Sequence, residues 1–255
     1  MMRTWYEALV VIDREKQISF MNYGYAGLDP NEDSLVLDET DEPNRYAIQM
    51  YHHVASAIDL SDKDVVEIGS GRGGGAAYIA RQLKPKSMLG IDLSNNAIEF
   101  CKQQYSLDRL SFARGDAEAI PLPDNSVDVL INVESSHCYG SMERFLSEVR
   151  RILRPGARFL FADHRDREQL PVLRRQFEDA RFEIIRETDI TANVVRALEL
   201  DNQRKRELIH SASPRVLWHE AEEFAALVGT RAYESFRTQD SPYVSFVLRT
   251  VAGPY

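Results

Sequence analysis

The sequence has little cysteine and no long apolar run. Its two cysteines, Cys101 and Cys138, form no Cys-x-x-Cys pair, so neither a disulfide framework nor a zinc site is indicated. We therefore expect reduced thiols in a cytoplasmic protein. The longest apolar stretch near the start, residues 8–12, is too short for the core of a signal peptide or for a membrane span, so no integral membrane contact is expected.

Positive charge is also scarce. The 255 residues include 31 Lys and Arg against 40 Asp and Glu, which gives a formal net charge of −9. Phosphate backbones are bound mainly through clustered Lys and Arg, so nucleic acid is not an expected partner. No group of His, Cys, Asp and Glu has metal-ligand spacing, and we expect no metal. A homodimer is left open.

What the sequence does contain is an alternation of short apolar strands with amphipathic helices. Pro155-Gly156 is typical of a helix stop followed by a tight turn into the next strand. Such alternation predicts a doubly wound α/β fold, a parallel sheet covered on both faces. Strands are predicted at 64–68, 87–91, 110–114, 127–133, 158–163, 182–190 and 243–250, and helices at 44–58, 74–83, 95–105, 142–153, 192–209 and 215–228.

The most informative segment is residues 65–75, where a strand runs into a glycine-rich turn that opens a helix. In this context Gly-x-Gly-x-x-Gly indicates nucleotide binding, because Gly69 and Gly71 let the main chain turn sharply and lie against a ligand. A tight turn without a ligand would need fewer glycines than the five found in residues 69–75. The pattern alone does not separate a nicotinamide cofactor from S-adenosylmethionine.

Two acidic residues bear on that choice. Glu67 precedes the first glycine by two residues, where dinucleotide folds usually carry an apolar residue, and its carboxylate suits a ligand with a cationic amino-acid tail. Asp92 ends the next strand, about where an acceptor for a ribose diol is expected. The alternative role of Asp92 is to cap the following helix, which Ser94 or Asn95 can also do.

The third and fourth strands end in further polar residues. Asp116 can accept from an adenine amine while the main-chain N–H of Ala117 binds the ring, and Asn132 and Glu134 end the fourth strand. The carboxyl ends of parallel strands meet at one edge of a sheet, where open α/β folds bind ligands. We therefore expect one ligand site there.

These motifs resemble those of class I S-adenosylmethionine-dependent methyltransferases. Glu67-x-Gly69-x-Gly71, Gly90-Ile91-Asp92, residues 115–118 and residues 153–156 follow that family's order and spacing. Residues 41–45, 73–76 and 132–139 more narrowly resemble the mycobacterial phthiotriolone and phenolphthiotriolone dimycocerosate methyltransferases and the fatty-acid O-methyltransferases.

The resemblance implies a Rossmann-like, seven-stranded, mainly parallel sheet with an N-terminal helical segment and a helical cap inserted before the last strand. Residues 1–60 would form an N-terminal lid, residues 61–165 the core that binds S-adenosyl-L-methionine, and residues 166–255 would complete the sheet and place the cap over the acceptor pocket. The cofactor-binding positions implied are Glu67, Gly69, Ser70, Gly71, Asp92, Leu93, Asp116, Ala117, Glu118, Asn132, Val133 and Glu134. Tyr25 and Arg45 would close over the methionine end.

The resemblance also implies methyl transfer to a hydroxyl or carboxyl oxygen of a small natural product, polyketide or lipid-like molecule, with S-adenosyl-L-homocysteine as product. An alcohol must lose a proton as it attacks, and His137, after the fourth strand, is the candidate catalytic base. Its alternative is a structural histidine. We interpret His164 as a surface-loop residue, Cys138 as a packed side chain and residues 204–207 as a solvated charged face.

Other functions remain open. They are methylation of carbon or nitrogen on a small metabolite, a nicotinamide-dependent oxidoreductase, and a module that binds the cofactor without turnover. Glu67 is unfavourable for the oxidoreductase, and His137 together with the acidic positions is unfavourable for the binding module.

Overall fold

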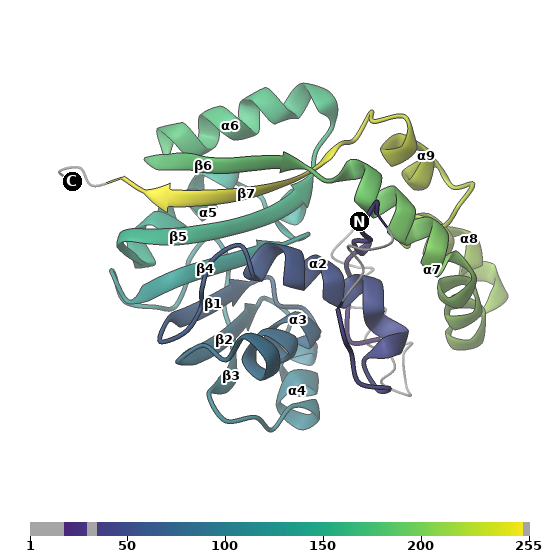
Figure 1. Cartoon of the computed structure of the whole chain (residues 1–255), viewed down its shortest axis with the longest axis horizontal. Coiled ribbons are helices and arrows are strands. Elements are labelled where there is room, and N and C mark those ends of the chain that lie inside the picture. Colours follow the sequence, from purple (N-terminus) through teal and green to yellow (C-terminus); the bar gives the residue numbers. More distant parts are fainter. Residues whose placement is uncertain (1–17, 30–34, 252–255) are drawn as a thin grey trace.

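The computed structural model describes residues 18–29 and 35–251. These residues form one seven-stranded sheet in the order β3-β2-β1-β4-β5-β7-β6 (Figure 1). The first five strands pair in parallel, and β7 is antiparallel to both of its neighbours. The predicted fold class is confirmed. The strands are β1 (Asp64–Ile68), β2 (Ser87–Asp92), β3 (Leu110–Arg114), β4 (Val127–Val133), β5 (Leu153–His164), β6 (Phe182–Asp189) and β7 (Tyr243–Thr250).

Helices cover both faces of this sheet because successive side chains of a strand point to opposite sides. Val65 packs in one apolar cluster with α2, α3 and α4, whereas Val66 packs in a second cluster with α5 and α6. The main helices are α2 (Arg45–Ala55), α3 (Gly74–Tyr78), α4 (Asn95–Gln104), α5 (Met142–Ile152), α6 (Leu170–Asp179), α7 (Thr191–Ala212), α8 (Trp218–Phe224) and α9 (Arg231–Arg237).

Shorter helical pieces join these elements. A π-helical turn, η2 (Ile79–Leu83), continues α3, and η1 (Glu42–Asn44), η3 (Ser136–Cys138), η4 (Arg167–Gln169) and η5 (Arg215–Leu217) are 3₁₀ turns. Asn44 precedes α2 but makes no capping side-chain hydrogen bond, whereas the Ser94 hydroxyl accepts from the first turn of α4. Asp92 is therefore not needed as the cap of that helix.

The structure departs from the predicted elements in three places. β5 begins at Leu153 rather than Arg158, because Leu153 already pairs with Val127 ahead of an irregularity in the register. Residues 215–228 form η5 and the short α8 rather than one helix. Helices α6 and α9 were not predicted, although the buried Leu170, Leu173 and Phe177 of α6 have helical spacing.

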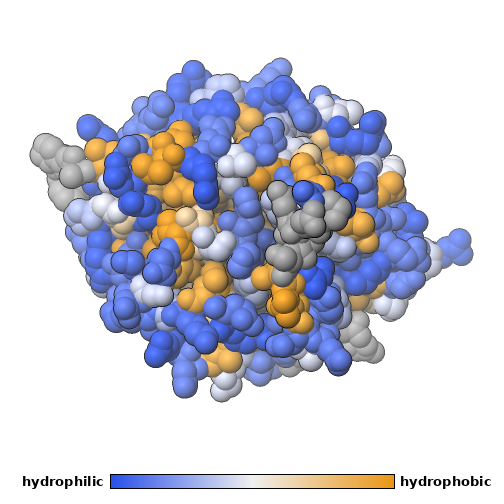
Figure 2. Space-filling model, viewed as in Figure 1, coloured by the Kyte–Doolittle hydropathy of each residue, from blue (hydrophilic) through white to orange (hydrophobic). Residues whose placement is uncertain are grey.

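The cap predicted before the last strand consists of α7, α8 and α9, which follow β6 and lie at one end of the sheet (Figure 1). The visible surface is mostly hydrophilic, with apolar residues in small separate groups (Figure 2). Within the described residues, no helix combines the length and the apolar character that crossing a membrane requires.

Candidate functional site

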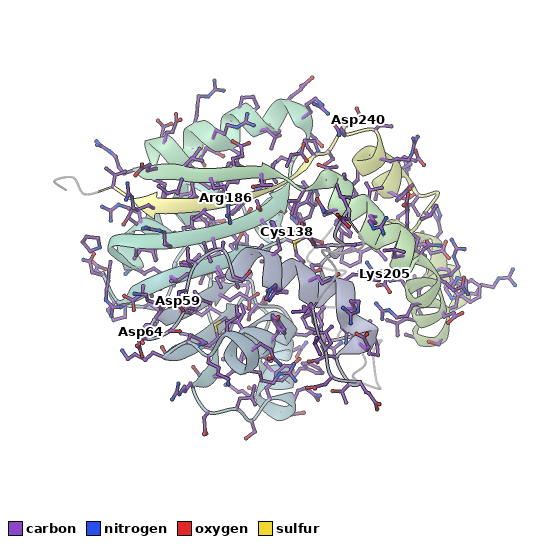
Figure 3. The ribbon with its side chains drawn as sticks, in the orientation of Figure 1. Asp59, Asp64, Cys138, Arg186, Lys205 and Asp240 are labelled. Atoms are coloured by element: carbon purple, nitrogen blue, oxygen red, sulfur yellow. The ribbon has the colours of Figure 1, made fainter. Side chains whose placement is uncertain are left out.

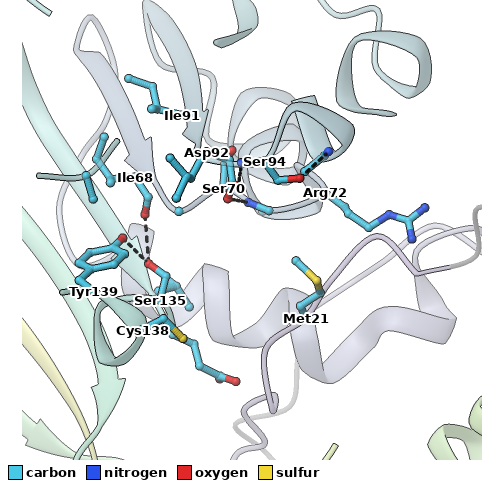
Figure 4. A pocket seen from close by; sticks show the side chains of 18 of the residues that line it. Met21, Ile68, Ser70, Arg72, Ile91, Asp92, Ser94, Ser135, Cys138 and Tyr139 are labelled. Carbon is cyan, nitrogen blue, oxygen red and sulfur yellow. Dashed lines mark hydrogen bonds between the residues drawn. The ribbon is translucent and has the colours of Figure 1, made fainter. Parts of the chain in front are cut away.

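A cavity of about 410 Å³ lies at the carboxyl ends of β1, β2, β3 and β4 (Figure 4). Residues 19–22, from the N-terminal segment (residues 18–29), also line the cavity, and the Ser19 carbonyl accepts from the main-chain N–H of Gly74 (3.2 Å). All the predicted cofactor positions except Glu67 and Asn132 line this cavity. Those that do are Gly69, Ser70, Gly71, Asp92, Leu93, Asp116, Ala117, Glu118, Val133 and Glu134.

The glycine loop presents bare main chain to the cavity. Gly69 and Gly71 have φ of +77° and +52°, in the left-handed region that glycine adopts without strain. A Cβ at Gly69 would clash with the Ser135 side chain, and one at Gly71 would clash with the side chain of Met21. Packing and the positive φ both require glycine at Gly69; at Gly71 the requirement comes from the positive φ, because the Met21 methyl group ends a flexible side chain.

Asp92 fastens this loop to the end of β2. One carboxylate oxygen accepts from the main-chain N–H of Gly71 (2.8 Å) and the other from that of Ser94 (2.9 Å). Asp92 also lines the cavity, so the carboxylate that fixes the loop lies where a ligand would contact it.

Glu67 lies behind the glycine loop rather than in the cavity wall. Its side chain is fully buried, and Oε1 accepts from the Tyr51 hydroxyl at 2.7 Å. Oε2 forms no hydrogen bond with the described residues. Burial raises the pKa of Glu67 to about 8, although the Tyr51 hydrogen bond opposes this shift. Tyr51 itself lines the cavity, so its ring stands between Glu67 and a ligand.

Asn132 and Glu118 hold the walls together. The Asn132 amide nitrogen, with two N–H groups to donate, lies within hydrogen-bond distance of the Ile68 carbonyl (2.9 Å), the Ser135 hydroxyl (2.8 Å) and the Tyr139 hydroxyl (2.9 Å), which joins β1 to the turn after β4. Glu118 accepts from the main-chain N–H groups that precede α5.

Tyr25 and Arg45, predicted to close over the methionine end, do not line the cavity. The Tyr25 ring stacks on His53 with 4.5 Å between ring centres, and Arg45 binds the Leu35 carbonyl and Glu42. From the N-terminal segment, residues 19–22 line the cavity instead.

The predicted base, His137, lies beside the cavity and is held by a buried carboxylate. Its Nδ1 lies 2.8 Å from Oδ1 of Asp163, a residue with no exposed surface. The Asp163 carboxylate also accepts from the His164 and His137 main-chain N–H groups, the Ser136 hydroxyl and Arg165. These donors leave the carboxylate no freedom to turn away.

The charges of this pair stabilise one another. Burial alone would lower the pKa of His137, but the Asp163 carboxylate outweighs it and raises that pKa to about 11. Burial would raise the pKa of Asp163, yet the positive charges of His137 and Arg165 hold it well below its usual range. At neutral pH the pair is therefore an imidazolium next to a carboxylate.

His164 is not the surface-loop residue that the sequence predicted. Its ring packs against those of His137, Phe236 and Tyr23, and burial lowers its pKa to about 4. His137, Asp163 and His164 offer ligand atoms within 4.8 Å of one another. However, Asp163 already accepts several hydrogen bonds and contacts the Arg165 cation, so the donor set favours a hydrogen-bonded pair over a metal centre.

Two further interpretations from the sequence were wrong. Cys138 is exposed and lines the cavity instead of being packed (Figure 4). Lys205 is not part of a solvated face: it lies on the side of α7 next to the N-terminal segment (Figure 3), and its ammonium donates to the Tyr23 carbonyl at 3.1 Å. Burial lowers the pKa of Lys205.

Sequence reasoning missed Tyr51, Asp163 and residues 19–22. Asp163 had a usable signal, since it follows the apolar run of β5 at the same sheet edge. Tyr51 and residues 19–22 had none, because their approach to the loop depends on how remote segments pack.

Known proteins match this chain along its length. Residues 66–161 match the family model described as a methyltransferase domain. The fatty-acid O-methyltransferase of Mycolicibacterium smegmatis is 37% identical over 90% of this chain and 82% of its own. The phthiotriol/phenolphthiotriol dimycocerosates methyltransferase of Mycobacterium tuberculosis is 39% identical over 90% of this chain and 84% of its own.

Among solved structures, the [4+2]-cyclase SpnF superposes with a TM-score of 0.73 at 19% identity, covering 98% of this chain and 95% of its own. That likeness concerns the fold, and the cyclase's name shows that the fold alone does not determine the reaction. The assignment rests on the identity to the two enzymes and on the matching domain. The chain is therefore an enzyme of the S-adenosylmethionine-dependent methyltransferase family.

Proposed function

We propose that this enzyme binds S-adenosyl-L-methionine in the 410 Å³ cavity and methylates an oxygen of a lipid-like acceptor, with a carboxylate oxygen favoured. The observation that carries the proposal is the bare glycine loop facing Asp92 across the ends of neighbouring strands. The relatives named for fatty-acid and phthiotriol substrates support the lipid-like acceptor.

The residues present fit such a cofactor. The main chain at Gly69 and Gly71 forms a cradle that a Cβ at either position would fill, and the carboxylate of Asp92, which lines the same cavity, would accept from a ribose diol. Asp116 and Ala117 would hold the adenine. The Tyr51 hydroxyl, which donates to Glu67 and lines the cavity, would accept a hydrogen bond from the cofactor's ammonium group, and the Glu67 carboxylate behind it would balance that charge.

When bound, the cofactor supplies an electrophilic methyl group. The protein's contribution is to align the acceptor oxygen and to exclude water, since methyl transfer is an in-line displacement. Residues 19–22, which line the cavity beside the glycine loop, would serve as a lid that excludes water. The three-part division into lid, cofactor core and capped acceptor part is also proposed.

His137 favours a carboxylate as acceptor. With its pKa at about 11 it carries a proton at neutral pH, so it attracts an anionic oxygen and is a poor base. A carboxylate needs no base in order to attack. The second candidate acceptor is a hydroxyl, for which His137 would first have to lose its own proton to Asp163 or to solvent.

A binding and turnover experiment tests the proposal. Calorimetric titration with S-adenosylhomocysteine should show binding, and NAD should show none. Incubation with S-adenosylmethionine and long-chain carboxylic acids should then yield methyl esters, detected by mass spectrometry. Binding of NAD alone, or methylation only at carbon or nitrogen, would refute the proposal.

We propose three further properties of the enzyme. We expect a cytoplasmic enzyme because both cysteines are free thiols. We expect a small-molecule acceptor rather than nucleic acid because acidic residues predominate. The homodimer stays an untested prediction.

A further inference from the structure

Glu134, the first residue after β4, has a strained main-chain conformation. Its φ of +47° lies in the left-handed region, which is unfavourable for a residue with a Cβ. The Glu134 main-chain N–H donates to the Ala162 carbonyl of β5 at 2.8 Å, which holds this conformation in place. Strain of this kind persists where the surrounding structure imposes it, and it is frequent at functional sites. The conformation of Glu134 therefore points to a functional role.

The two carboxyl oxygens of Glu134 differ in their surroundings. Oε2 accepts from the Tyr23 main-chain N–H (2.9 Å) and from the Tyr243 hydroxyl (2.9 Å). No donor to Oε1 is present among residues 18–29 and 35–251, and this oxygen is not one of the enclosed polar atoms of that part of the chain. Glu134 lines the cofactor cavity. Because the two bonds to Oε2 fix the carboxyl group, Oε1 is left to a proton donor in the cavity.

The order of the strands places this carboxyl on the acceptor side of the proposed cofactor. Asp116 follows β3, Asp92 ends β2 and the glycine loop follows β1, so the proposed cofactor contacts come from three neighbouring strands (Figure 1). β4 is next in the sheet, followed by β5, which carries Asp163. An acceptor next to the reactive end of the cofactor would therefore lie near Glu134 and His137.

The surroundings of Glu134 suit a group that takes up and releases a proton near neutral pH. Burial raises the pKa of Glu134 to about 7, against the opposing effects of the Tyr23 N–H bond and the His137 charge. A general base works best when its pKa lies near the working pH, whereas the pKa of His137 is about 11. The titratable groups near this carboxyl come from separate segments and are Tyr23, Tyr51, His137, Asp163, Lys205 and Tyr243.

We propose that Glu134 is the general base for hydroxyl acceptors, so that this enzyme methylates alcohols as well as carboxylic acids. As the hydroxyl oxygen bonds to the methyl carbon, the electron pair of the carbon–sulfur bond stays on sulfur and the hydroxyl proton passes to Oε1. Solvent takes up this proton before the next turnover. His137 then serves the anionic oxygen of a carboxylate. This inference rests on the proposed function for the position of the methyl group.

Two matched acceptors test the proposal: a saturated fatty acid and the primary alcohol of equal chain length, each with saturating S-adenosylmethionine. Glu134→Gln should lower turnover of the alcohol about 100-fold and leave that of the acid nearly unchanged, because a carboxylate needs no base. Glu134→Asp should restore part of the alcohol turnover. In calorimetry, both variants should bind S-adenosylhomocysteine nearly as the wild type does.

The pH dependence gives a second readout. In the wild type, the ratio of alcohol to acid turnover should rise with pH and level off above about pH 7, where Glu134 is ionised. Glu134→Gln should abolish this rise. Glu199→Gln is the matched control, because Glu199 also accepts from a tyrosine hydroxyl, that of Tyr233 (2.7 Å), but does not line the cofactor cavity. It should leave the ratio unchanged.

Four results would overturn the proposal. They are equal losses of acid and alcohol turnover in a Glu134→Gln variant that still binds S-adenosylhomocysteine, wild-type alcohol turnover in that variant, loss of S-adenosylhomocysteine binding in both Glu134 variants, and a wild type that methylates acids but no alcohol. Failure of the proposed function gives a different result, namely no S-adenosylhomocysteine binding by the wild type or no methylation of either acceptor.

Discussion

The hydroxyl of Tyr51 lies 2.7 Å from Oε1 of Glu67, and this contact joins α2 to the first strand of the sheet behind the glycine loop. Tyr51 faces the cavity while Glu67 does not. Glu67, the acidic residue that favours S-adenosylmethionine over a nicotinamide cofactor in the sequence, therefore acts on a ligand only through Tyr51, which comes from a different segment of the chain. Several properties of the enzyme should depend on this pair.

Cofactor affinity should rise with pH up to about pH 8. Because burial raises the pKa of Glu67 to about 8, this carboxyl is protonated in the free protein at lower pH and must lose its proton to attract an ammonium. The affinity for S-adenosylhomocysteine should increase by up to about tenfold per pH unit below that value and level off above it. In calorimetry, Glu67→Gln should weaken binding and flatten this profile. A wild-type affinity independent of pH from about 6 to about 8 would contradict the relay through Tyr51.

Gly75→Ala should displace Tyr51. An added Cβ at Gly75 would overlap the Tyr51 ring, although alanine is otherwise favourable in a helix. We expect a loss of about 2 kcal/mol or more in the free energy of unfolding and weaker binding of S-adenosylhomocysteine. Gly156→Ala is the control: its φ of +76° is unfavourable for alanine, but no atom lies within 4 Å of the added Cβ. Denaturant unfolding would compare the free energies of unfolding of the two variants, and equal losses would argue against the close packing of Gly75 on Tyr51.

Glu134 should make the protein less stable as pH rises. Burial raises its pKa from 4.5 to about 7, so the folded state favours the protonated carboxyl. Its stabilising contribution is complete below pH 4.5 and is lost as pH rises to about 7, with a slope of up to about 1.4 kcal/mol per pH unit. Glu134→Gln should remove this part of the pH dependence. The measurement is urea unfolding at a series of pH values. If Glu134→Gln keeps the wild-type dependence of stability on pH, Glu134 is not the group responsible for it.

Methyl transfer should depend on the charge of His137. His137→Ala should lower turnover at low acceptor concentration about tenfold or more, because the imidazolium that attracts the anionic oxygen is lost, and should leave the affinity for S-adenosylhomocysteine unchanged. Lost cofactor affinity in this variant would instead make His137 a cofactor-site residue, and unchanged turnover would remove it from the reaction.

Asp163→Asn should change the pH profile of turnover. Without the Asp163 carboxylate, burial lowers the pKa of His137, so the imidazolium should disappear near or below its usual value of 6.5. For a carboxylic acid acceptor, the wild-type rate should be flat from about pH 6 to about pH 9, and the variant's rate should fall over this range. A wild-type rate that rises with pH would indicate a base and a hydroxyl acceptor.

Local pattern was sufficient for most of the sheet and for the positions around the glycine loop. The strands of the core, the left-handed Gly69 and Gly71 and the acid that ends β2 follow from hydrophobic periodicity and from backbone sterics, which act over a few residues. Because parallel strands end at one edge, the convergence of these residues on one cavity was also predictable.

Tyr25, Arg45 and His164 show where this reasoning fails. Each was assigned a place from its position in the chain, yet the structure stacks Tyr25 on His53, pairs Arg45 with Glu42 and buries His164 among aromatic rings. These outcomes depend on contacts between segments far apart in sequence, which no local pattern encodes.

The amino-acid sequence by itself determined the fold class, the methyltransferase family and the ligand-binding edge, since strand alternation and glycine geometry are local properties. Only the tertiary structure decided that Glu67 lies behind Tyr51 and that Asp163 holds His137 as an imidazolium. The physical reason is that burial and charge pairing arise when remote segments pack together, and these set the pKa of each group and the partners left to a ligand.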